Sequence, residues 1–296
     1  MYFNEETLVY LNGKWIEASA ASTNLYAQTL HYGSGVFEGI RSYQTEDGVM
    51  IFKAREHFDR LLYSAGKMHI SLPYSAEELE AVCYELLDKN GLQNAYIRPL
   101  VFLGPNMSLQ PTQEVNFFVC AWEWEKYLGD QLLHVMTSSY QRPNPKSCHV
   151  DAKVVGHYTN SILATTEAKQ KGYDEALLLD ANGYVAEGPG ANFFFEKNGI
   201  LYTPPLGNIL PGITRSTVIE LADELGFEVQ EKYFTIDEVK GSDGAFFTGT
   251  AAEVAGIASL DGVSFRAKWE DTMGSELARM YTYRVTSREY NSFELV

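Results

Sequence analysis

Three short segments of the 296-residue chain carry groups whose type and spacing could support catalysis. Lys153 stands between small and apolar neighbours at residues 150–156, where poor hydration favours the neutral amine that attacks a carbonyl carbon. Glu187 precedes Gly-Pro-Gly at the end of a predicted strand, so its carboxylate could point into a cleft. Pro211 and Gly212 lead into a predicted helix whose first backbone amides could hold a phosphate group.

Each of these features also has an ordinary structural interpretation. Lys153 could be a surface lysine whose methylene stem covers apolar neighbours, and Glu187 could be a solvated turn residue. The segment at Pro211 could be a capped helix start without a ligand. For any one feature taken alone the structural interpretation is favoured, so a functional prediction depends on their joint order.

Other common catalytic and metal sites lack support in the sequence. P-loop, dinucleotide-binding, HExxH and GxSxG patterns are absent. The six histidines are scattered without ligand spacing, so no metal site is predicted. Cys83, Cys120 and Cys148 form no CxxC pair and are predicted to be buried thiols rather than disulfides or zinc ligands.

Composition narrows the partners and the location of the protein. The formal net charge of −16 at pH 7 argues against nucleic-acid binding, so any anionic ligand must meet a few local cations and backbone amides. No apolar run reaches the roughly 18 residues that suggest a membrane span. The first residues lack the pattern of a secretory signal, so a cytoplasmic protein is expected.

The N-terminal part of the sequence predicts an α+β lobe. An Asn-Gly turn within residues 9–16 indicates a hairpin. Apolar residues at helical spacing across 58–65 and a capping box at the start of 75–90 indicate two helices. Apolar stretches at 95–103 and 115–122 are typical of strands. We therefore expect a sheet with two helices packed against it.

The chain is longer than one hydrophobic core usually organises, which indicates two domains. Residues 1–122 are predicted to form a small N-terminal α+β domain, residues 123–134 the connection, and residues 135–296 a larger C-terminal domain. The elements predicted for that second domain are a helix at 157–170, strands at 175–179, 184–187 and 192–196, and a helix that follows Gly212 and ends at Gly226.

Seven ordered motifs give the chain a family resemblance over nearly its whole length. They are LHYGSGVFEGIR at 30–41, REHFDRL at 55–61, AYIRPL at 95–100, AK with GHY at 152–158, EGPGANF at 187–193, LPGITR at 210–215 and TGTAAE at 248–253. The sequence resembles the class IV, or fold-type IV, aminotransferases, and within them the branched-chain aminotransferases. The resemblance implies a small N-terminal α+β domain and a larger, mostly-β pseudo-barrel domain with helices.

The resemblance also implies pyridoxal 5′-phosphate as cofactor. Lys153 would carry it as a Schiff base, Glu187 would bond its pyridine nitrogen, and Tyr158 its phenolic oxygen. A carboxylate at the ring nitrogen keeps that nitrogen protonated, which makes the ring an electron sink. The groups expected to hold the phosphate are Arg60, the backbone amides of Ile213 and Thr214, and Thr250.

The family pattern further assigns residues to amino acids and 2-oxo acids as substrates. Tyr96 and the amides of Thr250 and Ala251 would receive the α-carboxylate. The expected apolar walls are Phe37, Trp124, Tyr127 and Tyr158, and the groups expected at the distal carboxylate of glutamate are Arg98, Tyr32 and Tyr127. The implied reaction is ping-pong transamination of leucine, isoleucine or valine with 2-oxoglutarate, in which Lys153 is both nucleophile and general base.

Several alternatives share the cofactor motifs. D-amino acid aminotransferases, (R)-selective amine transaminases and aminodeoxychorismate lyases have the same lysine, glutamate and phosphate arginine, whereas residues 32–41 and 96–98 favour the branched-chain group. His157 and residues 107–109 leave the preference among leucine, isoleucine and valine open. A non-catalytic binding protein with this fold would have no need for Lys153 and a matched Glu187. The resemblance suggests a homodimer in which Tyr32 reaches the neighbouring subunit's site, with further assembly left open.

Overall fold

The computed structural model describes residues 2–124 and 127–287, which fold into two compact units. The first unit comprises Met1–Glu125, Ala152–His157 and Thr286–Val296. The second comprises Lys126–Asp151 and Tyr158–Val285. The short segment that contains Lys153 therefore belongs with the N-terminal part of the chain.

The first unit is built on a seven-stranded sheet in the order β2-β1-β7-β6-β4-β5, with β3 paired to β6. Its strands are β1 Leu8–Leu11, β2 Lys14–Glu17, β3 Val36–Phe37, β4 Ile40–Thr45, β5 Gly48–Ile51, β6 Ala95–Leu103 and β7 Val115–Glu123, and its helices are α1 Gln28–Tyr32, α2 Ala54–Lys67 and α3 Ala76–Asn90. The predicted hairpin, both predicted helices and both long strands are confirmed. Asn12 and Gly13 both have positive φ, as the tight turn of such a hairpin requires.

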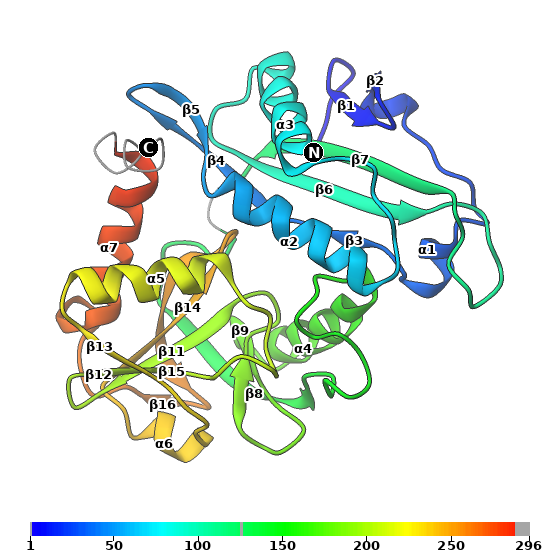
Figure 1. Ribbon diagram of the computed structural model, residues 1–296. Coiled ribbons are helices and arrows are strands. Elements are labelled where there is room, and N and C mark those ends of the chain that lie inside the picture. Colours follow the sequence, from blue (N-terminus) through cyan, green and yellow to red (C-terminus); the bar gives the residue numbers. More distant parts are fainter. Residues whose placement is uncertain (1, 125–126, 288–296) are drawn as a thin grey trace. The chain divides into compact units, whose positions relative to one another are not determined.

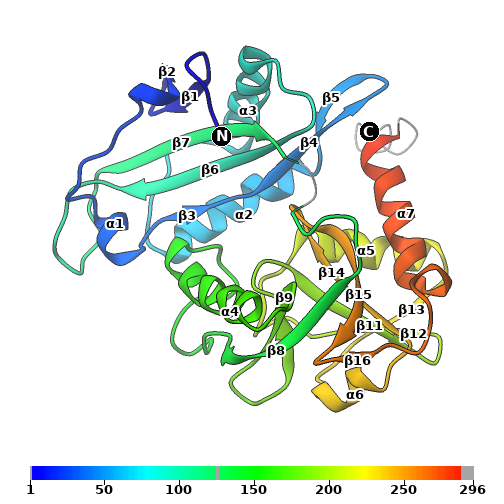
Figure 2. The same ribbon diagram turned by 180° about the vertical axis from the view of Figure 1, so that it is seen from behind.

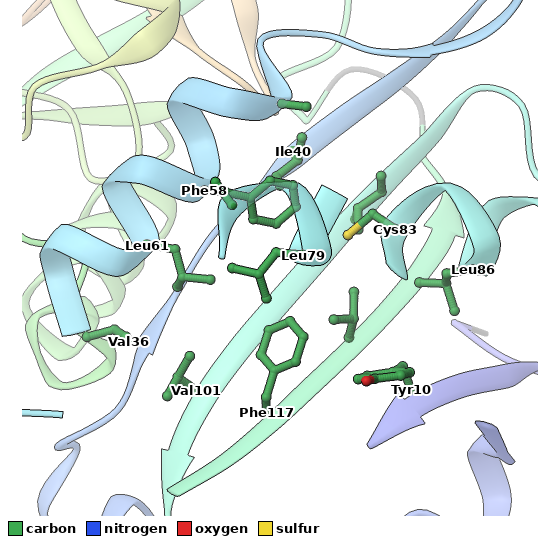
Figure 3. Packing of buried hydrophobic residues seen from close by; sticks show 14 of the residues in the cluster. Tyr10, Val36, Ile40, Phe58, Leu61, Leu79, Cys83, Leu86, Val101 and Phe117 are labelled. Atoms are coloured by element: carbon green, nitrogen blue, oxygen red, sulfur yellow. The ribbon is translucent and has the colours of Figure 1, made fainter. Parts of the chain in front are cut away.

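Helices α2 and α3 cover one face of this sheet (Figures 1 and 2). Phe58 and Leu61 of α2 pack with Leu79 of α3 over Val101 and Phe117 of the two long strands (Figure 3). Each fully buried side chain of this kind contributes about 1.5–3 kcal/mol. The core therefore fixes the orientation of α2 and of the polar side chains on its other faces.

Cys83 of α3 lies in the same core, as predicted for a buried thiol. Burial raises the pKa of Cys120 to about 11, yet Cys120 and Cys148 both keep intermediate exposure. The prediction of three buried thiols is therefore right only for Cys83. Cys120 alternates along β7 with residues that face the helices, so it lies on the other face of the sheet.

The second unit contains a nine-stranded sheet in the order β10-β9-β8-β15-β14-β11-β12-β13, with β16 paired to β15. An additional pairing of β10 with β11 closes six of these strands into a ring, which is the predicted pseudo-barrel. Its strands are β8 Leu133–Gln141, β9 Glu175–Leu179, β10 Val185–Glu187, β11 Asn192–Lys197, β12 Ile200–Thr203, β13 Glu228–Glu231, β14 Gly244–Gly249, β15 Glu253–Leu260 and β16 Val263–Ser264.

Four helices accompany this sheet: α4 Tyr158–Gln170, α5 Ile213–Glu224, α6 Ile236–Lys240 and α7 Met273–Thr286. Helix α4 packs on β8 and β9, and α5 on β13 and β14 (Figure 2). Short 3-10 turns occur at Ala18–Ala20, Val155–His157 and Trp269–Asp271. The predicted helices at 157–170 and after Gly212, and the three predicted strands, are confirmed within one or two residues.

Phenylalanines of alternate positions fill the interior of the ring. Phe193 and Phe195 of β11 pack with Phe234 and Phe247 in one buried cluster. The intervening Phe194 faces the other side and stacks on Phe246 with ring centroids 5.1 Å apart. Because the interior is filled with apolar side chains, polar groups of the second unit are available mainly at strand ends and turns.

The longest helix in the described part of the chain is α3, with 15 residues. A membrane span needs about 20 mostly apolar residues. Within residues 2–124 and 127–287, none of the helices has the length and hydrophobicity to cross a bilayer.

Candidate active site

Lys153 lies in a short irregular segment, just before the 3-10 turn Val155–His157, that hydrogen-bonds to residues 33–37 of the first unit. The amide of Phe37 donates to the Lys153 carbonyl at 3.1 Å, and the Lys153 amide donates to Oγ of Ser64 at 3.0 Å. Further along, the amide of Gly156 donates to the Gly33 carbonyl at 2.9 Å. Gly33 has φ +66°, and a Cβ there would lie 2.7 Å from Cα of Gly156, so only glycine permits this close approach. The backbone of Lys153 is thus held on both sides.

The aromatic ring of Phe37 lies next to two cations. Nζ of Lys153 is 5.1 Å from the ring centroid, and Cζ of Arg98 is 4.8 Å from it. The Arg98 guanidinium also lies over the rings of Tyr96 and Trp122, and it donates to the Tyr96 hydroxyl at 3.3 Å. An aromatic face stabilises a cation without cancelling its charge. The structure therefore places the side chains of Lys153 and Arg98 around one apolar ring.

The aromatic surroundings extend to Trp124, whose ring meets that of Tyr96 edge-on with centroids 4.8 Å apart. Phe37, Tyr96, Arg98 and Trp124, all predicted from the sequence, are joined by these contacts. Tyr32 is not among the residues that these contacts join. It lies on α1 with 46% of its surface exposed, and its hydroxyl donates to the Met107 carbonyl at 3.1 Å.

Arg60 is held by the carboxylate of Glu38, which was not among the predicted site residues. Its Nε donates to Oε1 of Glu38 at 2.7 Å, and its Nη2 donates to Oε2 at 2.9 Å. Nδ1 of His57 lies 2.8 Å from the same Oε2. Glu38 has no exposed surface. Glu38 and His57 both stand in the quoted motifs, and the acidic residue within the apolar run GVFEGI is the signal that could have revealed this pair.

The charges of this group follow from burial and contact. Burial alone would raise the pKa of Glu38, but Arg60 and His57 outweigh it and lower that pKa, so the carboxylate is ionised. For His57, burial lowers the pKa and outweighs the opposing effect of Glu38. The imidazole is therefore neutral at pH 7. Its single N–H proton is placed on Nδ1, because the Glu38 carboxylate accepts a hydrogen bond there.

Glu187 of the second unit ends β10 and is 4% exposed. Its carboxylate accepts from Nδ2 of Asn192 at 3.0 Å and from the Leu210 amide at 3.2 Å. Nε of Arg142 lies 2.8 Å from Oε1. Neither Arg142 nor Asn192 was predicted: Arg142 stands outside the seven motifs, and Asn192 is one polar residue within the motif at 187–193. The result is a buried carboxyl group at the end of a strand, in contact with one arginine and two hydrogen-bond donors.

The N-terminus of α5 is tied to the same carboxylate. Nδ2 of Asn192 also donates to the Leu210 carbonyl at 2.9 Å, two residues before Gly212, the N-cap of α5. A Cβ on Gly212 would lie 1.9 Å from Oδ1 of Asn192, so this position requires glycine. Since a glycine cap has no side-chain acceptor, the first amides of α5, at Ile213 and Thr214, are suited to an anion.

The turn between β14 and β15 carries Thr250 and Ala251. It lies beside the turn between β10 and β11, since a Cβ on Gly249 would be 3.1 Å from the Gly190 carbonyl oxygen. The amide of Tyr127 donates to the Ala251 carbonyl at 3.0 Å, which brings this half-exposed tyrosine to the same turn. Tyr158, the first residue of α4, is half-buried. In the described residues no cluster of three or more His, Cys, Asp or Glu side chains could hold a metal.

Comparison with known proteins gives consistent matches. The family model of class IV amino-transferases matches residues 35–260. The chain is 42% identical over 284 residues to a branched-chain-amino-acid aminotransferase of Pseudomonas aeruginosa, covering 94% of this chain and 92% of that protein. A branched-chain aminotransferase from the archaeon Thermoproteus uzoniensis, solved with norvaline, has a TM-score of 0.92 at 37% identity and covers 97% of both chains. A second solved branched-chain amino acid aminotransferase, complexed with N-(5′-phosphopyridoxyl)-L-glutamate, has a TM-score of 0.91 at 38% identity, again with 97% coverage of both chains.

Proposed function

Because the chain belongs to the class IV aminotransferase family, we propose that it is a pyridoxal-phosphate-dependent branched-chain aminotransferase. It transfers the amino group of leucine, isoleucine or valine to 2-oxoglutarate, giving branched-chain 2-oxo acids and L-glutamate. The observation that carries the proposal is the placement of Lys153 and Arg98 around the ring of Phe37. Relatives complexed with norvaline and with N-(5′-phosphopyridoxyl)-L-glutamate support both substrate classes.

The donor set fits the cofactor. Lys153 supplies an amine for its carbonyl group, and Glu187 a buried carboxylate for its ring nitrogen. The phosphate suits the uncapped amides at the start of α5, which also favour an anion through the helix dipole. The further groups proposed to hold the cofactor are Arg60 and Thr250 at the phosphate and Tyr158 at the phenolic oxygen. When bound, the cofactor supplies an electron sink for the carbanion at the substrate Cα.

Two kinds of substrate must use one pocket, and the first unit offers walls for both. Phe37, Tyr96 and Trp124 present apolar surface of the kind that binds an aliphatic side chain. The guanidinium of Arg98 lies against these rings and can pair with the distal carboxylate of glutamate or 2-oxoglutarate. For the α-carboxylate we propose the Tyr96 hydroxyl and the amides of Thr250 and Ala251. Tyr127, together with Tyr32 reaching in from the neighbouring subunit, completes the pocket beside Arg98.

Lys153 performs two tasks in the proposed mechanism. Its Nζ first holds the cofactor covalently, and the incoming amino acid displaces it. The freed amine would then take the proton from the substrate Cα and pass it to C4′ of the cofactor, and it would move a proton in the opposite direction in the second half-reaction. The hydrogen bonds of its backbone to Phe37 and Ser64 keep the start of the side chain fixed while the amine moves between these tasks.

The test is substrate discrimination by the cofactor-loaded protein. L-Leucine, D-alanine, (R)-1-phenylethylamine and aminodeoxychorismate are added in separate cuvettes, and loss of the visible cofactor band is followed. We expect rapid loss with L-leucine only, restored by 2-oxoglutarate with formation of L-glutamate. Loss with D-alanine or the amine instead would overturn the substrate assignment while leaving the family intact.

A lysine variant tests the catalytic group itself. Lys153→Ala should abolish turnover and the visible band of the covalently bound cofactor. Lys146→Ala, which changes an exposed lysine, serves as the control and should behave like the unchanged protein. Substantial transamination by Lys153→Ala after exchange of the cofactor would contradict the assignment.

We also propose that the chain forms a homodimer through an apolar surface on α1, the residues just before it and a neighbouring loop. Gln28 of α1 donates to the carbonyls of Ser108 and Gln110, which holds the loop against the helix. The exposed apolar side chains of this surface are Leu25, Tyr26, Leu30, Tyr32, Met107 and Leu109. Exposed apolar surface of this kind marks interfaces. Light scattering should show a dimer that the double substitution Leu30→Asp and Leu109→Asp dissociates, whereas a stable, active monomer would refute it.

A further inference from the structure

Arg142 forms a buried ion pair with the carboxylate proposed to face the cofactor ring. Its Nε lies 2.8 Å from Oε1 of Glu187, and the two side chains are 8% and 6% exposed. Arg142 follows β8 directly, and its amide donates to the Leu179 carbonyl at 2.8 Å. Both partners therefore stand on fixed backbone of the same unit, and the pairing does not depend on a flexible loop.

The carboxylate of Glu187 does not need an arginine in order to be satisfied. The Leu210 amide lies 3.2 Å from both of its oxygens, and Asn192 donates to Oε2 at 3.0 Å. A buried ion pair is commonly no more stabilising than apolar residues of the same volume. Stability alone thus gives little reason for a cation here. An arginine adds one thing that amides cannot, a positive charge that it never loses.

We propose that Arg142 is a positioning residue that keeps Glu187 ionised and thereby keeps the proton on the cofactor's ring nitrogen. The inference rests on the proposed function of Glu187. One proton is shared between the ring nitrogen and the carboxylate. Because the arginine is in contact with the carboxylate, it favours the charged arrangement, with proton on nitrogen, over the neutral one, with proton on oxygen. Without the cation the proton moves from nitrogen to Glu187, and the ring becomes a weaker electron sink.

The direct readout is the ¹⁵N resonance of ring-labelled pyridoxal phosphate bound to the protein, which reports protonation without turnover. We expect the unchanged protein to show a protonated ring nitrogen across its active pH range. Arg142→Met, which removes the charge but keeps the length, should move the resonance towards the unprotonated position. Arg142→Lys, which keeps a positive charge at this position, should bring the resonance most of the way back to that of the unchanged protein.

Asn160→Ala is the matched control. The Asn160 side chain is another neighbour of the Arg142 guanidinium, with 3.5 Å from Nη1 to Oδ1, and its loss changes no charge. It should leave the ¹⁵N resonance in place. Arg142→Met should also slow the Cα proton transfer from L-leucine by about tenfold or more, and a larger isotope effect with α-deuterated leucine should accompany this.

The possible outcomes separate this inference from the proposed function. A folded Arg142→Met variant with an unshifted ¹⁵N resonance would overturn the role of Arg142, even if the unchanged protein transaminates leucine. An unprotonated ring nitrogen in the unchanged protein would overturn it as well, which keeps the inference testable should Arg142→Met not fold. Failure of the unchanged protein to convert any L-amino acid would instead refute the proposed function, since the resonance does not depend on turnover.

Discussion

Replacing Glu38 with glutamine tests how strongly the buried carboxylate holds the arginine proposed for the phosphate. The substitution removes the negative charge but keeps the shape, and it leaves the Arg60 guanidinium, only 11% exposed, without its buried counterion. The new amide group must also point its hydrogens at donors of Arg60, His57 or Gly39. Breaking a buried pair in this way costs about 3–5 kcal/mol.

The melting temperature gives the measurable magnitude. At roughly 2–4 °C per kcal/mol, Glu38→Gln should lower Tm by about 6–20 °C. Scanning calorimetry and circular dichroism of the same samples measure it. The control is Asp59→Asn on the same helix, because the exposed Arg55–Asp59 pair should leave Tm unchanged within error. A Tm drop for Glu38→Gln no larger than for the control would refute the reasoning.

The stabilising effect of Glu38 should also depend on pH in a defined direction. Because the folded pKa of Glu38 lies below its ordinary value, its stabilising effect is present above about pH 4.3, the ordinary pKa of glutamate. It is lost as the pH falls from there towards the folded pKa. Measured in a His57→Gln background, in which the neighbouring histidine no longer titrates, the stability difference caused by Glu38→Gln should therefore be constant near neutral pH and shrink in acid. A difference that grows on acidification would contradict the assignment of an ionised Glu38.

Three further predictions concern other parts of the site. Gly212→Ala should destabilise the second unit by about 1–3 kcal/mol in urea unfolding and weaken cofactor retention, because the new Cβ would overlap Oδ1 of Asn192. Unchanged stability would contradict that geometry. The folded pKa of His57 is lowered by burial, so stability should fall by up to about 1.4 kcal/mol per pH unit below roughly pH 6.5, and His57→Gln should flatten this slope in denaturation curves. Arg98→Leu should reduce kcat/KM for 2-oxoglutarate by about 10–100-fold, which corresponds to the loss of one charge-assisted hydrogen bond, and should leave kcat/KM for L-leucine unchanged. Equal losses for both substrates would reject a role of Arg98 at the distal carboxylate.

Elements defined by neighbouring residues were predictable from the sequence. The Asn12-Gly13 turn and the Ser75 capping box are local signals, and the structure has a hairpin and a helix start at those places. Strand β8 was not predicted, because its central stretch mixes His134, Ser138 and Ser139 with apolar residues. Its place in the sheet is set by β15 and β9, and such distant pairing leaves no mark on the strand's own pattern.

The same distinction applies to the site. Lys153, Glu187 and the start of α5 occupy recognisable positions in motifs, so their types and order were predictable. The charged residues that pair with Arg60 and Glu187 were not predictable. Glu38 reaches Arg60 across the step from β3 to α2, and Arg142 reaches Glu187 from the end of β8. These pairs depend on how strands and helices assemble, which no single segment of the sequence specifies.

The cations of the first unit divide into two kinds, and the division bears on how an acidic protein attracts acidic substrates. With a net charge of −16, the chain as a whole repels carboxylates. Arg60 is paired with Glu38 through Nε and Nη2, which form one edge of its guanidinium, so the pair carries no net charge and can offer a phosphate directed donors rather than attraction. Arg98 instead lies on aromatic faces, which leave its charge in force. In the proposed function, recognition of the distal carboxylate would therefore depend on Arg98, whereas attraction of the cofactor phosphate would depend on the helix amides of the second unit.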